Sequence, residues 1–171
     1  MEQKEIYLGK RRFIQEGTAM ADEFFNLASS DEYAAKRLCE NRCYNQAAYF
    51  YIQSMEKYIK GYICQKINVT NETYAEMLRE LKHSLNETVD LLVKIISGNE
   101  VGLKQQVEYQ LKVVILRNVN FSVMHNAVRY PYYYGKRQQY SVTDIRSEDC
   151  KVLEEIYASL KNYLKQLSLR L

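Results

Sequence analysis

The feature that most constrains this chain is a helical spacing of apolar residues that continues over nearly its whole length. Apolar side chains recur at steps of three and four residues over about 13–27, 29–40, 48–63, 74–81, 84–97, 99–124 and 147–167. The 171 residues include one Pro and six Gly, too few for a turn-rich β-sandwich. No strand pattern competes with the helical one. We therefore predict an all-α fold, an antiparallel up-and-down bundle of about five helices.

Several local signals predict where these helices begin and end. Ser29 and Ser84 are each followed three residues later by Glu, the spacing of a capping box, which predicts helix starts at both serines. Gly98 is predicted to end the helix that begins at Ser84, as a residue with positive φ. Ser147, followed by two acidic residues, predicts the start of the last helix. Residues 126–146 are predicted to be irregular, and a connection of this length is often functional.

The length of the chain fits one domain, and we expect residues 1–16 to be an N-terminal extension of a helical domain over 17–171. A net charge of +3 is too small by itself to indicate a nucleic-acid-binding protein. No run of 18 apolar residues predicts a membrane span, and no apolar run follows the N-terminus as in a secretion signal. We therefore expect a cytoplasmic protein without a membrane partner, whose four cysteines are reduced thiols.

Metal and cofactor motifs are weak in this sequence. Glu80 and His83 have the spacing of half a di-metal motif, but a carboxylate-bridged bundle site needs a second such pair. Glycine-rich phosphate loops and nucleophile elbows are absent from the sequence. We therefore predict neither a metal nor a cofactor, and we interpret His83 as a partly buried polar residue near a helix start.

The irregular segment is rich in tyrosine and in basic residues. The chain has sixteen Tyr and no Trp, and several of these tyrosines flank Pro131 and Gly135. Tyrosine rings beside cations suit single-stranded RNA, because rings stack on bases and cations pair with phosphates. The alternative is that these rings pack on the core or in a dimer interface. The candidate contacts to a nucleic acid or nucleotide are Arg129, Tyr130, Tyr132, Tyr133, Lys136 and Arg137.

Four segments, taken in order, resemble the HEPN domain family. Residues 44–63, with Gln53, Glu56-Lys57 and Lys60, resemble the second helix of that family. The other three are His83-Ser84-Leu85, Arg129-Tyr130-Pro131 and Ser147-Glu148-Asp149. Together they cover roughly residues 20–169. The resemblance implies a helical bundle that is commonly a homodimer, often with a nucleotidyltransferase partner in a toxin–antitoxin pair.

Many HEPN proteins are metal-independent ribonucleases that use an Arg followed by a polar residue and, several positions later, a His. The resemblance therefore points to Arg117, Asn118 and His125 as candidate catalytic residues, with seven residues between Arg117 and His125, one more than the family pattern. In that hypothesis His125 is the base for a ribose 2′-hydroxyl, Arg117 stabilises phosphate charge, and Asn118 orients either group. The alternative is an Arg117 ion pair and a His125 that ends a helix.

Three functions remain open from the sequence. The first, which we favour, is a HEPN-like module that acts with a nucleotidyltransferase partner or binds nucleic acid or a nucleotide. The second is a dimeric, metal-independent endoribonuclease that uses Arg117 and His125. The third is a structural helical dimerisation protein without chemistry of its own.

Overall fold

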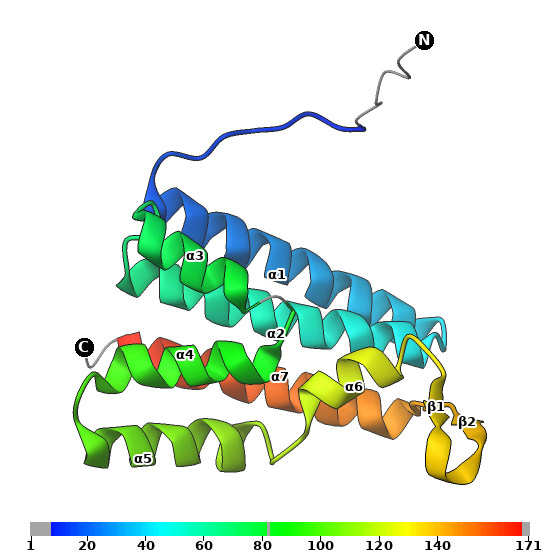
Figure 1. Cartoon of the computed structure of the whole chain (residues 1–171). Helices are drawn as coiled ribbons and strands as arrows, with labels where there is room; N and C mark the ends of the chain where they lie inside the picture. The colour runs from blue at the N-terminus through cyan, green and yellow to red at the C-terminus, as the bar shows by residue number, and fades with distance from the viewer. Residues whose placement is uncertain (1–7, 82, 169–171) are drawn as a thin grey trace.

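The computed structural model describes residues 8–81 and 83–168, and most of them are helical (Figure 1). The described residues form seven α-helices and one small sheet. The α-helices are α1 (Gly17–Glu40), α2 (Tyr44–Lys66), α3 (Glu72–Glu80), α4 (Leu85–Ser97), α5 (Val101–Tyr109), α6 (Phe121–Ala127) and α7 (Ser147–Ser168). The predicted helical fold is confirmed, but the described part of the chain holds more helices than the five expected, and the sequence pattern did not predict its sheet.

Helices α1 and α2 lie side by side in opposite directions (Figure 1). Ala21, Ala28 and Ala35 are buried at seven-residue intervals on α1, and such small side chains allow the two backbones to come close. The buried hydroxyl of Ser54 on α2 donates a hydrogen bond to the carbonyl oxygen of Ala28 at 2.6 Å. Helix α1 runs without a break along α2. The chain therefore has one helix where two were expected, and the predicted helix start at Ser29 is wrong.

The first helix also begins later than expected. We included Phe13 in its apolar stripe, but α1 begins at Gly17 and the Phe13 side chain is 81% exposed. Leu27, a second member of the stripe, is also exposed. The buried face of α1 is instead made of the small alanines, which hydrophobic patterning weighs less than large side chains.

Helix α2 is the central element of the bundle. It contacts α1, α4, α6 and α7, and fourteen of its residues are buried. Helix α7 presents the predicted apolar stripe to it, with Leu153, Ile156, Leu160 and Leu164 buried. Because α2 is surrounded, its polar face is also enclosed by protein.

None of the described helices has the length and apolar composition that a bilayer crossing requires.

The start and end predicted for α4 are confirmed. The hydroxyl oxygen of Ser84 accepts a hydrogen bond from the backbone N–H of Glu87 at 3.3 Å, as a capping residue does. Gly98 follows the helix with φ of 53°, a value that favours glycine. Helix α7 begins at Ser147, as predicted.

The predicted single helix over 99–124 is wrong. Helix α5 continues into a π-helical turn, Gln110–Ile115, and the chain then breaks before α6. In an uninterrupted helix, Leu116 and Phe121 would lie about 140° apart around the axis. Both side chains are buried in the same core, so the break allows packing that a straight helix would prevent.

Candidate nucleic-acid interface

The segment predicted to be irregular contains a short β-hairpin that projects from one end of the bundle (Figure 1). Strand β1 (Tyr132–Tyr134) pairs antiparallel with β2 (Gln139–Ser141), and a 3₁₀ turn, Gly135–Arg137, connects them. The side chain of Asn45 at the start of α2 fixes the return of the hairpin. Its Nδ2 donates to the Thr143 carbonyl oxygen at 2.7 Å, and its Oδ1 accepts from the Ile145 N–H at 2.8 Å.

The tyrosines of this segment face outward. Strand alternation places the rings in two pairs on opposite faces of the hairpin. Tyr132 and Tyr134 form one pair with ring centroids 5.7 Å apart, and Tyr133 and Tyr140 form the other at 5.2 Å. These four tyrosines and Tyr130 are 49–70% exposed, so within this chain they do not pack in the core.

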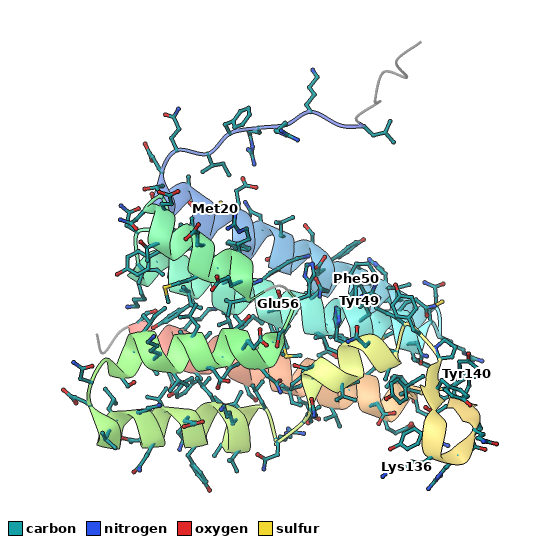
Figure 2. The ribbon with its side chains drawn as sticks, viewed as in Figure 1. Met20, Tyr49, Phe50, Glu56, Lys136 and Tyr140 are labelled. Atoms are coloured by element: carbon teal, nitrogen blue, oxygen red, sulfur yellow. The ribbon has the colours of Figure 1, made fainter. Side chains whose placement is uncertain are left out.

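Cations accompany these rings. The Arg137 guanidinium lies 6.0 Å from the Tyr134 ring centroid, and Lys136 is at the turn of the hairpin (Figure 2). The structure therefore gathers the predicted contact residues of the hairpin on one exposed element. Arg129 and Tyr130 precede it, after the end of α6.

Arg129 belongs to a row of stacked groups that runs away from the hairpin. Its guanidinium lies 4.7 Å from the Tyr130 ring centroid and 5.0 Å from that of Tyr49, and it donates to the Tyr130 hydroxyl at 2.7 Å. The Tyr49 ring in turn lies 5.2 Å from the His125 ring, and His125 lies 6.3 Å from His83 at an interplanar angle of 16°. We call these five residues the stacked row. It joins the hairpin to the segment before α4.

His125 is the buried member of the stacked row, only 5% exposed. Gln53 Nε2 lies 2.9 Å from His125 Nε2. An amide nitrogen can only donate, so this ring nitrogen accepts and the imidazole is neutral. Burial lowers the pKa of His125, and the positive charge of Arg129 lowers it further. A neutral, hydrogen-bonded imidazole is the state that this environment favours.

A buried ion pair on α2 lies close to His83. Lys60 Nζ donates to Glu56 Oε1 at 2.7 Å, and the Glu56 residue is only 2% exposed. His83 Nδ1 lies 3.9 Å from the same oxygen, whereas Glu56 Oε2 has no hydrogen-bond partner among the described residues. Gln53, Glu56 and Lys60 are all buried, although they lie outside the apolar stripe of the helix.

A sequence signal for this polar face existed. Gln53, Glu56 and Lys60 follow one another at steps of three and four, so they share one face of a helix. A polar face of a helix is usually exposed to solvent. The packing of α4 and α6 on α2 encloses it.

The candidate catalytic residues Arg117 and Asn118 lie in the break before α6. Both have positive φ, 53° and 56°, which is uncommon for residues with a side chain. Arg117 donates to Glu155 of α7 at 3.0 Å, the ion pair that we considered as the alternative. No hydrogen bond, ion pair or ring contact between described residues joins Arg117 to His125.

His83 does not match its predicted environment. Its side chain is 74% exposed, although we expected a partly buried residue. Across the described ranges, 8–81 and 83–168, no group of three or more His, Cys, Asp or Glu has an arrangement that could hold a metal ion. The four cysteines are free thiols.

Comparisons of this chain with models of known families, with curated proteins and with solved structures found no significant match. The likeness to HEPN domains therefore stays a prediction that rests on the four sequence segments and their order.

Proposed function

We propose that this chain is a HEPN-like helical module that binds single-stranded RNA through its hairpin. The observation that carries this proposal is the exposure of five tyrosines beside cations at one end of the bundle. Exposed rings are available for stacking, which is worth about 1–3 kcal/mol per base and tolerates any sequence. The neighbouring cations supply the phosphate contacts. The proposed contacts are Arg129, Tyr130, Tyr132, Tyr133, Lys136 and Arg137.

Binding without cleavage is the form of this function that the geometry favours. A general base needs a nitrogen that can reach the 2′-hydroxyl of the substrate. His125 is almost fully buried, and its Nε2 is occupied by Gln53. Arg117, the other half of the proposed pair, is bound to Glu155. We therefore do not assign the ribonuclease reaction to Arg117, Asn118 and His125.

The test is the affinity for a fluorescent single-stranded oligouridine, measured by anisotropy at several salt concentrations. The double variant Tyr133→Ala/Tyr140→Ala removes one ring pair from the hairpin, and we expect it to weaken binding by about tenfold or more. The charge variant Lys136→Gln/Arg137→Gln should weaken binding and reduce its salt dependence, because fewer counterions are released. A DNA oligonucleotide of the same length measures the contribution of the ribose hydroxyls.

A matched control is available on α1. Tyr33 is exposed and carries Arg37 over its ring at 5.1 Å, an aromatic–cation pair on an element other than the hairpin. Tyr33→Ala should leave the affinity unchanged. The proposal fails if the wild type binds no oligonucleotide, or if the hairpin variants bind as well as the wild type. RNA shortened by the purified wild type, but not by Arg117→Ala or His125→Ala, would restore the ribonuclease hypothesis.

The resemblance adds partners to this proposal. We propose that the chain forms a homodimer and acts with a nucleotidyltransferase, in the cytoplasm and in a toxin–antitoxin setting. Exposed apolar side chains on α5 and the π turn, among them Val101, Tyr109 and Val114, support an association surface. Light scattering after size exclusion tests the homodimer: a monomer mass at micromolar concentration would contradict it.

A further inference from the structure

We infer that His83 is a second stacking site for the RNA strand, separated from the hairpin by the other members of the stacked row. This inference rests on the proposed function and extends it, because it predicts that a long strand makes a contact that a short one does not. The observation behind it is that the His83 and His125 rings lie nearly parallel, His83 being exposed and His125 buried.

The position of the His83 ring makes it suitable for a nucleobase. One face lies against His125, with ring centroids 6.3 Å apart and an interplanar angle of 16°. The side chain is nevertheless 74% exposed, so most of its surface is open to solvent. A base that stacks on the exposed His83 ring would continue the stack of rings already present in the protein.

The His83 ring also has two buried polar neighbours. Its Nδ1 lies 3.9 Å from Oε1 of the buried Glu56, and its ring lies beside that of the buried His125. These neighbours distinguish His83 from a histidine that projects alone from the surface.

The site is continuous with the proposed hairpin interface. The stacked row begins at the exposed Tyr130, next to the hairpin, and passes through Arg129 and Tyr49 to the two histidines. Each neighbouring pair in the row is about one stacking distance apart. Tyr130 and His83 at the two ends of the row are exposed and His125 between them is buried, so a strand that contacts both ends passes over His125 without stacking on it.

The test compares oligouridines of two lengths, four and twelve nucleotides, with wild type, His83→Ala and His83→Phe. We expect His83→Ala to bind the long strand about tenfold more weakly and the short strand as well as the wild type does. His83→Phe should restore long-strand affinity, since a phenyl ring stacks without a charge. This rescue separates stacking from a merely electrostatic role of His83.

The outcomes distinguish this inference from the proposed function. If the hairpin variants lose binding while His83→Ala binds both lengths like the wild type, the second site is wrong and the hairpin interface stands. If the wild type binds neither length, both ideas fail together. Circular dichroism of each variant checks the fold, and Glu80→Ala, an exposed change at the end of α3, is the control that should bind like the wild type.

Discussion

The His83 and His125 rings are stacked 6.3 Å apart at an angle of 16°, although 41 residues separate them in the chain and no other histidine exists in it. Their environments differ strongly, because one ring is exposed and the other is enclosed between α2 and α6. Burial therefore acts on the titration of His125.

The first prediction concerns pH. The folded-state pKa of His125 is lowered from 6.5, chiefly by burial, so the unfolded chain binds this proton more readily. The stabilisation is complete above about pH 6.5 and should be lost progressively as the pH falls below it. Urea unfolding at pH 8.0, 6.5 and 5.5 measures this loss. His125→Gln should flatten the dependence in this range, whereas His83→Gln should retain it; identical pH profiles for all three proteins would contradict the assignment.

The second prediction concerns the contact of α1 with α2. A Cβ added at Gly61 would lie 2.9 Å from Phe25 Cε1, closer than carbon atoms approach. We expect Gly61→Ala to lower the free energy of unfolding by about 1–3 kcal/mol. The matched control is Gly102→Ala on α5, where a Cβ meets nothing within 4 Å, and it should stabilise the protein by about 0.5–1 kcal/mol. Urea denaturation gives both values, and equal effects would be incompatible with this packing.

The third prediction concerns the break before α6. Asn118 has φ of 56°, which costs a residue with a Cβ roughly 1–2 kcal/mol and costs Gly almost nothing. Asn118→Ala should therefore lower the free energy of unfolding by about 1 kcal/mol, since Asn tolerates this conformation better than Ala. Asn118→Gly should leave it unchanged or raise it. Should Ala prove as stable as Gly at this position, the left-handed conformation is not present.

The fourth prediction concerns the thiols. Burial raises the pKa of Cys64 to about 11 and that of Cys150 to about 12, which leaves little thiolate near neutral pH. Cys43 is the exposed cysteine. A disulfide reagent at pH 8 should modify one thiol rapidly and the others slowly. Cys43→Ser should remove the fast phase and Cys150→Ser should keep it; a fast phase that survives Cys43→Ser would show that Cys39 or a buried thiol is accessible to the reagent.

Local chemistry explains which predictions from the sequence held. The start of α4 depends on Ser84 and the N–H three residues later, and its end depends on Gly98, so both are encoded within a few positions. The start of α7 at Ser147 and its apolar stripe are equally local. The candidate contacts of the hairpin were likewise visible as tyrosines beside cations. The exposure of these tyrosines could not be predicted, because no local sequence feature distinguishes a tyrosine packed on the core from one exposed to solvent.

The sequence by itself determined that this chain is helical, where α4 and α7 begin, and which segment carries aromatic and basic side chains. Only the tertiary structure decided the rest. The burial of Glu56 and Lys60 depends on α4 and α6 covering α2, and the break at Arg117 depends on Leu116 and Phe121 entering one core. The contact between the His83 and His125 rings also depends on how distant segments pack. Caps and periodicity act through the neighbouring turn, whereas burial and long-range stacking depend on which helices pack together, and no single segment contains that information.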